Sequence, residues 1–287
     1  MMDVGISKLK ILSEIKKREV VLPIVMERVI TKPLLVGDDL SIRSSVVSPD
    51  LYDMNITKMI YNHLEFPNRD RKPTFDEFIS TITNVDRQCA LWGILSGTYG
   101  KIENEEVTCN KCGKTFKITV PYDDLIHDDT FTLWNENKPH TEYVRTVEFD
   151  INSGDILKLE VDIGLLPISR RLGVMGFVTV DKIRENFNLT KTIFSLSEQM
   201  STITKEIRVV GTEGTVKIDS IQEILIAYNN YLTYDIIEKI AEEFSYFNKY
   251  TPKFYVNITC NNCSDIIRYE VDMELGLFRS YLRWARS

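Results

Sequence analysis

The sequence has no long apolar run and a shortage of positive charge. No stretch of about 18 uncharged apolar residues occurs, so we expect no transmembrane helix. The first residues mix charged and apolar side chains and lack the basic start and apolar centre of a secretory signal peptide. Asp and Glu number 42 against 35 Lys and Arg, which gives a net charge of −7. Since dedicated nucleic-acid binders are usually basic, we expect neither a membrane nor a nucleic acid as the partner.

Signatures of catalysis are also missing. The sequence contains no glycine-rich phosphate loop, no nucleophile elbow and no carboxylates placed as a recognisable acid–base pair. Its three histidines, His63, His127 and His140, have no partner spacing typical of metal ligands. Acidic residues surround His127, and we interpret them as a solvated loop: Asp123, Asp124, Asp128 and Asp129. The sequence therefore predicts a protein that is not an enzyme.

The chain does contain enough apolar residues for a core. It has 287 residues, 43% of them hydrophobic, which suits one large or two ordinary domains. Helical and strand periods alternate along the chain and predict an α+β fold with β-hairpins. Helices are expected over 6–15, 51–66, 74–80, 84–96, 179–189, 191–200, 220–232, 233–247 and 274–285, with Gly97 and Gly100 ending the fourth. Strands are expected over 20–26 with a bend at Pro23, 116–120, 143–149, 156–161, 206–210, 215–218 and 267–273.

Four of the five cysteines form two Cys-x-x-Cys pairs, Cys109 with Cys112 and Cys260 with Cys263. Each pair lies between two strand-like stretches, so we expect each to form a knuckle in the turn of a hairpin. Four thiolates in two such pairs suit one tetrahedral zinc ion with no open coordination position. The sequence therefore predicts a structural zinc site, a zinc-ribbon-like element built from two distant knuckles.

The neighbours of the two pairs differ. Gly113 follows the first pair and tolerates the positive φ that such a turn often requires. Lys111 and Lys114 add positive charge near its thiolates. Ser264 stands at the place of Gly113 in the second pair, which makes that turn a weaker match.

Other interpretations of the thiols remain open. One is that the pairs are reduced thiols that pack in hairpin turns without a metal. Another is a redox dithiol, although thioredoxin-like cysteines lie at a helix start after a strand, which neither pair shows. The fifth cysteine, Cys89, lies on the apolar side of an expected helix, and we interpret it as an inert buried thiol.

The two knuckles follow the same order of elements: two helices, a strand, the knuckle and a returning strand. We therefore expect two helix-plus-knuckle units, over about 74–125 and 220–282, joined by a segment of hairpins and helices. Together they make a region over 73–287, which an α/β extension over 1–72 precedes. The stretch 274–285 is amphipathic and partly basic, and it either docks to a partner or packs on its own domain.

A series of short motifs carries a family resemblance. They are Asp86-Arg87, the stretches 91–95 and 97–100, Cys109-Asn110-Lys111-Cys112-Gly113, Val120 and Leu125, and later Cys260, Cys263 and Gly276-Leu277-Phe278. In this order they resemble the baseplate hub family of T-even-type contractile-tailed phages. The resemblance runs from about residue 74 to the end of the chain, and residues 1–72 have no counterpart.

The resemblance implies a structural or assembly protein of a phage tail baseplate hub that acts by binding, not by catalysis. Its implied partners are other baseplate, hub and tail proteins, with the tape-measure protein as one candidate. Its implied location is the virion tail baseplate, assembled in the host cytoplasm. The family includes both hub components and factors needed only during assembly.

Two other classes deserve comparison. Zinc ribbons also occur in nucleic-acid-binding and transcription factors, but the acidity of the chain and the lack of clustered basic and aromatic residues argue against that class. A metal-dependent enzyme needs an open coordination position, which a closed four-cysteine site does not offer.

Overall fold

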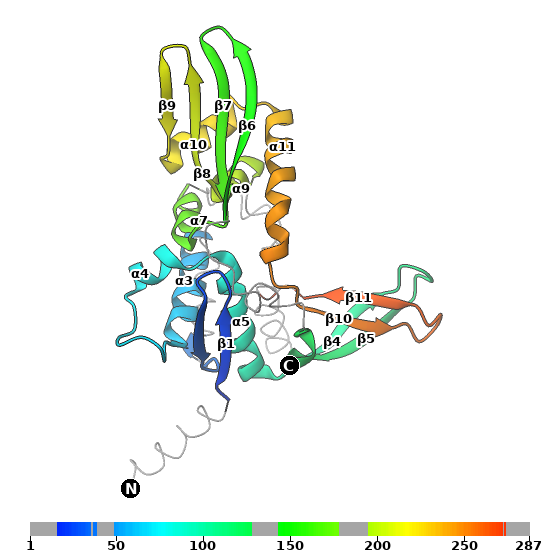
Figure 1. Ribbon diagram of the computed structural model, residues 1–287. Helices are drawn as coiled ribbons and strands as arrows, with labels where there is room; N and C mark the ends of the chain where they lie inside the picture. Colours follow the sequence, from blue (N-terminus) through cyan, green and yellow to red (C-terminus); the bar gives the residue numbers. More distant parts are fainter. Residues whose placement is uncertain are drawn as a thin grey trace.

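The computed structural model describes residues 16–35, 37–38, 49–127, 143–177, 195–271 and 273. In this part of the chain the fold mixes seven α-helices with four small antiparallel sheets, as the expected α+β class requires. They form two lobes and a pair of projecting hairpins (Figure 1). Of the predictions, the helices over 6–15, 179–189 and 274–285, and His140, lie outside the described residues. None of the helices in the described ranges is long and apolar enough to span a membrane.

The first lobe surrounds the buried helix α5 (Asn84–Tyr99). The elements packed around it are β1 (Arg18–Leu22), β2 (Glu27–Thr31), α3 (Pro49–Asn62), β3 (Leu64–Glu65) and α4 (Phe75–Thr81). The strand expected over 20–26 ends at Leu22, because the chain turns over 23–26 from the expected bend at Pro23. Strands β1, β2 and β3 make one antiparallel sheet. α5 begins with a capping box in which Thr83 and Asp86 each bond the other's backbone amide.

Two glycines let the sheet approach α5 closely. A Cβ on Gly93 would collide with side chains of β1 and β2, and a Cβ on Gly97 would lie 2.5 Å from the Lys16 carbonyl oxygen. The prediction that Gly97 ends the helix is therefore wrong. The helix continues to Tyr99, and Gly100, at φ 71°, terminates it.

Three further predicted elements end earlier than expected. The helix expected over 51–66 stops at Asn62, because Leu64 and Glu65 pair with β2. The helix expected over 233–247 is α11 (Tyr234–Phe244) followed by a 3₁₀ helix, η3 (Ser245–Tyr250). The strand expected over 267–273 is β11 (Ile266–Glu270). Tertiary pairing and packing decide these ends, and local periodicity does not encode them.

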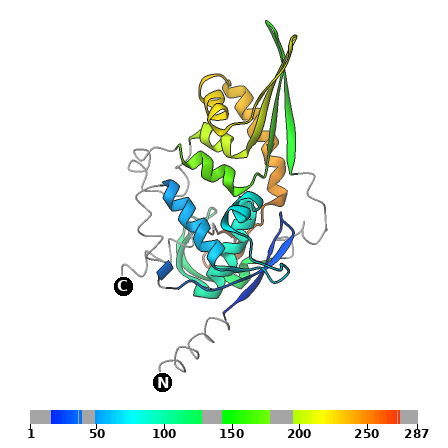
Figure 2. The ribbon, with the colours of Figure 1, turned by 90° about the vertical axis from the view of Figure 1, so that its left-hand side faces the viewer.

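The second lobe is a four-stranded sheet covered by helices on one face (Figure 2). Its elements are β6 (Val144–Ser153), β7 (Ile156–Gly164), β8 (Thr204–Gly211), β9 (Gly214–Ile218), α9 (Leu196–Ile203), α10 (Ile221–Asn230) and α11. Both predicted hairpins, β6–β7 and β8–β9, are confirmed. Alternate residues of β7, Leu159, Val161 and Ile163, enter the core, and the opposite face is charged, with Arg208 bonded to three carboxylates.

Helix α7 (Ile168–Met175) joins the lobes through a buried ion pair. The Arg87 guanidinium donates to Asp53 at 2.7 Å, both side chains being 1% exposed, and Arg171 of α7 donates to the second oxygen of Asp53 at 2.9 Å. Burial raises the pKa of Asp53, but the two guanidinium groups outweigh it and lower the pKa to about 2. A buried carboxylate between two cations thus connects α3, α5 and α7.

The projecting hairpins are β4 (Lys101–Thr108) with β5 (Thr115–Pro121), and β10 (Tyr255–Thr259) with β11. We call these four strands the ribbon arm (Figure 1). A 3₁₀ helix, η1 (Tyr122–Leu125), follows β5 into the first core. Phe254, just before β10, stacks on Trp92 of α5 with ring centroids 6.4 Å apart. Both hairpins are therefore rooted in the first lobe.

The two helix-plus-knuckle units share their order of elements but not their cores. Helices α10 and α11 of the second unit pack in the second core, whereas its hairpin joins the first core through Phe254 and Val256. The boundary expected at residue 72 falls inside the first core, because β1, β2 and α3 pack on α5. Packing divides the described residues between lobes, not at that position.

Candidate metal centre

The four predicted cysteines meet at the tip of the ribbon arm. The sulfur atoms of Cys109, Cys112, Cys260 and Cys263 all lie within 4.8 Å of one another. The shortest separations join the two hairpins: Cys109 Sγ to Cys263 Sγ, and Cys112 Sγ to Cys260 Sγ, are each 3.7 Å. Two turns far apart in the sequence therefore contribute two thiols each to one cluster.

The two knuckles have the same backbone geometry. The amide of Gly113 donates to the Cys109 carbonyl at 2.8 Å, and the amide of Ser264 donates to the Cys260 carbonyl at 2.9 Å. Gly113 has φ 69° and Ser264 has φ 59°. The weaker match expected of the second knuckle is therefore confined to its residue type, since Ser264 adopts the left-handed conformation of the glycine.

The two knuckles also match in the burial of their cysteines. The first cysteine of each pair is buried, Cys109 at 0% and Cys260 at 1% exposed, while Cys112 is exposed and Cys263 is half-buried. Across the tips, Lys111 Nζ of one knuckle lies 3.7 Å from an Asp265 carboxylate oxygen of the other. The cluster thus has an inner side against the arm and an outer side open to solvent.

Hydrogen bonds and the closeness of the other sulfurs shift the pKa values of the thiols in different directions. The Lys114 backbone amide and the Asn262 side chain lower the pKa of Cys112 to about 6. The backbone amides of Asn262 and Cys263 lower the pKa of Cys260. For Cys263, a bond from the Asp265 amide lowers the pKa, but desolvation and the neighbouring sulfurs outweigh it and raise the pKa to about 12. Some of these thiols ionise readily, and a bound cation is what stabilises all four as thiolates together.

The geometry fits a tetrahedral metal ion. A Zn–S bond of about 2.3 Å implies sulfur atoms about 3.8 Å apart, close to the 3.7 Å of the two cross-hairpin pairs. Within the residues that the structure describes, this is the one group of His, Cys, Asp or Glu side chains able to hold a metal ion. Four protein sulfurs complete a tetrahedron and leave no position for a substrate.

The remaining singled-out residues have structural surroundings. Cys89 is fully buried, and burial raises its pKa well above the usual range, so the expected inert thiol fits. His63 is buried between the Lys32 carbonyl and the Asp38 carboxylate.

His127 packs on the ribbon arm, against Tyr255 of β10. Its ring stacks on Tyr255 at 4.1 Å, its Nε2 lies 2.7 Å from the Tyr255 carbonyl oxygen, and Arg268 covers the other side of Tyr255 at 3.7 Å. Of the acidic neighbours expected around His127, Asp128 and Asp129 lie outside the described residues. This stack stabilises the start of β10. The sequence pattern does not predict the contact between His127 and Tyr255.

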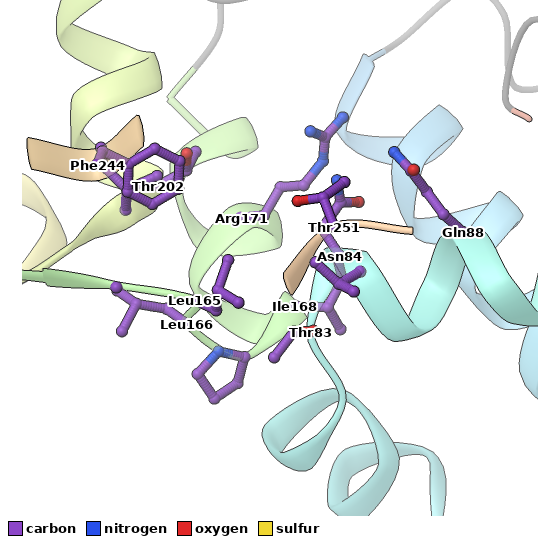
Figure 3. A pocket seen from close by; sticks show the side chains of 14 residues that line it. Thr83, Asn84, Gln88, Leu165, Leu166, Ile168, Arg171, Thr202, Phe244 and Thr251 are labelled. Atoms are coloured by element: carbon purple, nitrogen blue, oxygen red, sulfur yellow. The ribbon is translucent and has the colours of Figure 1, made fainter. Parts of the chain in front are cut away.

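A pocket of about 220 Å³ lies where the two lobes meet (Figure 3). Phe244 and Thr202 lie at one end of it, Asn84 and Gln88 at the other, and Arg171 between them. The Asn84 side-chain oxygen is buried without a hydrogen-bond partner, a position that an ordered water can satisfy. The lining comes from segments spread over much of the chain, so the sequence holds no signal for it.

Comparison of the chain with known protein families, sequences and structures gives no match. No protein-family model matches the chain, and no curated protein or solved structure matches it either. The case for function therefore rests on the site and on the motifs of the sequence.

Proposed function

We propose that the four cysteines bind one zinc ion and that the ion is structural. The observation that carries this proposal is the set of four sulfurs within 4.8 Å of one another, contributed by two hairpins. Zinc suits a closed tetrahedron of thiolates better than calcium or magnesium, which prefer oxygen ligands. The ion fastens the β10–β11 hairpin to the β4–β5 hairpin and fixes the ribbon arm to the first lobe.

The protein acts by binding other proteins, as a structural or assembly component of a contractile phage tail baseplate hub. The motif order that resembles the hub family supports this assignment, and the closed cluster accords with a role without catalysis. Its partners are other baseplate, hub and tail proteins, and its place is the tail baseplate. The zinc holds the surfaces that these partners contact.

Metal analysis tests the zinc. Protein purified under reducing conditions is expected to contain one zinc per chain, and replacement by cobalt(II) should give the strong visible bands of tetrahedral thiolate coordination. Cys112→Ser should lower the zinc content, while Cys89→Ala, a buried cysteine outside the cluster, should leave it unchanged. Fully folded protein without metal would contradict the proposal.

Cross-linking during infection tests the hub assignment. A tagged chain is expected to cross-link to tail proteins and to co-sediment with baseplates or their assembly intermediates. Presence in purified tails indicates a hub component, and presence only in intermediates indicates an assembly factor. A chain that co-sediments with neither and cross-links to no tail protein sinks the assignment, whatever its zinc content.

A further inference from the structure

The sheet of the second lobe extends beyond the helices that cover it. Lys239 of α11 donates to the Glu148 carbonyl of β6 at 2.9 Å, and further down Glu243 pairs with Arg145 at 3.2 Å, so α11 runs antiparallel to β6. From Lys239 to the start of α11 at Tyr234 the helix rises about 7.5 Å, but β6 continues from Glu148 to Ser153, about 17 Å. The hairpin ends therefore overhang the helical layer (Figure 1).

The core face of this end of the sheet is apolar, and its exposure rises toward the edge strand β9. Leu159, Val209 and Val216 stand opposite one another on β7, β8 and β9 and share that face. Leu159 is 6% exposed under the helices, whereas Val216 is 64% exposed on the edge strand.

The turn between α10 and α11 adds two aromatic side chains at the same end of the lobe. Tyr231 is 75% exposed and Tyr234 is 73% exposed. Ile151 of β6, which like Phe149 is partly buried against the second core, extends the apolar floor. We call Ile151, Val209, Val216, Tyr231 and Tyr234 the distal patch.

The rim of the distal patch is acidic. Exposed carboxylates lie in both hairpin ends and on the first turns of α11: Asp150, Asp155, Glu213, Asp235 and Glu238. Lys239 of α11 is bonded to the Glu148 carbonyl of the sheet. An apolar floor with an acidic rim suits a helix that is apolar on one side and basic on another.

The chain itself contains such a segment. Residues 274–287 place Leu275, Phe278 and Leu282 at helical spacing, and Arg279, Arg283 and Arg286 at i, i+4 and i+7 on a neighbouring side. Three arginines against one carboxylate, Glu274, give the segment a positive charge.

We propose that the distal patch of one copy receives residues 274–287 of a second copy. Met273, directly before the segment, is buried in the core of the first lobe, whereas the distal patch ends the second lobe. The residue that precedes the segment and the distal patch thus belong to different lobes, and the proposed contact joins two copies. Such a contact is head-to-tail, so each added copy offers a new free surface and assembly continues until a ring closes.

Sedimentation velocity on zinc-loaded full-length protein tests the contact over a concentration series. Val216→Glu places a charge in the distal patch at an exposed position, and Phe278→Glu places one in the segment. Thr215→Glu is the matched control, since it adds the same charge on the same strand but on the opposite face. We expect the wild type and the control to associate alike, and each of the other variants to associate at least about tenfold more weakly.

Mixing the two weakened variants gives the decisive result. The Val216→Glu chain keeps an intact segment and the Phe278→Glu chain keeps an intact patch, so together they should form a one-to-one complex that grows no further. A misfolded variant cannot restore the contact in this way. A wild type that stays monomeric at 100 µM (about 3 mg/ml), or a mixture that does not associate, overturns the proposal.

Discussion

At the scale of single residues, Gly113 and Ser264 hold equivalent places one residue after each second cysteine, both with positive φ. The sequence could predict the conformation at Gly113, because glycine adopts it readily. It could not predict it at Ser264, where the left-handed conformation accompanies the bond from the Ser264 amide to the Cys260 carbonyl. Left-handed backbone costs a residue with a Cβ about 1–2 kcal/mol.

Ser264→Gly should therefore stabilise the zinc-loaded protein. Glycine removes the backbone strain of a Cβ at positive φ, and this gain is larger than the free-energy cost of ordering a more flexible residue on folding. We expect the free energy of unfolding to rise by roughly 0.5–1 kcal/mol. Gly113→Ala should lose about 1 kcal/mol. Ser264→Ala keeps the Cβ and serves as control in denaturant titrations; equal effects of Gly and Ala at this position would contradict the argument.

Asp86 and Arg87 show that a sequence motif does not reveal the contacts its residues make. The sequence marks them as adjacent helix-start residues, but the contacts that keep them buried come from distant segments: Asp86 accepts from the Ile24 amide at 2.8 Å, and Arg87 donates to Asp53. Only the folded structure shows that the charge of Arg87 is neutralised by Asp53.

The Asp53 carboxylate should make stability depend on acid pH. Its pKa of about 2 in the folded protein lies below the ordinary value of 3.8, so its contribution is fully present above about pH 4 and is lost as the pH falls toward 2. The difference in unfolding free energy between the wild type and Asp53→Asn should narrow by on the order of 2 kcal/mol from pH 5 to pH 2. Exposed Asp124→Asn is the control, and a difference that stays constant for Asp53→Asn would refute the assignment.

At the scale of elements, hairpins were predictable, and so was the end of α5 at Gly100, but other helix ends were not. The Ser153-Gly154-Asp155 and Gly211–Gly214 turns announce β6–β7 and β8–β9 through local turn chemistry. The end of α3 depends instead on β3 pairing with β2, and the helix passes through Gly97 where the Lys16 carbonyl comes close. Those contacts are made by other segments, so local patterns carry no trace of them.

Metal removal should loosen one part of the protein only. A two-stranded hairpin is marginally stable alone, and β10–β11 is held by Phe254 at its base and by the cluster at its tip. With a chelator, hydrogen exchange should accelerate in β10 and β11 while β7 and β8, central in the other sheet, keep their protection. A Cys260→Ser and Cys263→Ser variant should show no further response to the chelator. Equal acceleration in both sheets would mean that the ion supports the whole fold.

At the scale of the whole molecule, the cysteine cluster was predictable because its four members come as two recognisable pairs. The interlobe pocket and the distal patch were not, since their residues are scattered over many elements and become neighbours only through the packing of α7, α10 and α11. The two helix-plus-knuckle units have the same order of elements but do not form two similar cores. The β10–β11 hairpin of the second unit packs on the first lobe, whereas its helices pack in the second. Sequence order and spatial grouping are therefore separate properties, and at the cysteine cluster residues from both units lie side by side.

A shared cluster has a thermodynamic signature that two separate knuckles lack. Cys109→Ser and Cys260→Ser should each destabilise the protein by several kcal/mol, because a structural zinc site contributes on the order of 10 kcal/mol. The double variant should cost little more than the worse single one, since either change already removes most of the binding energy of the same ion. Cys89→Ala, combined with either variant, should add its own cost independently. Denaturant titration in zinc-containing buffer measures all of these values, and additive costs for Cys109 and Cys260 would show that the two hairpins are not fastened by one ion.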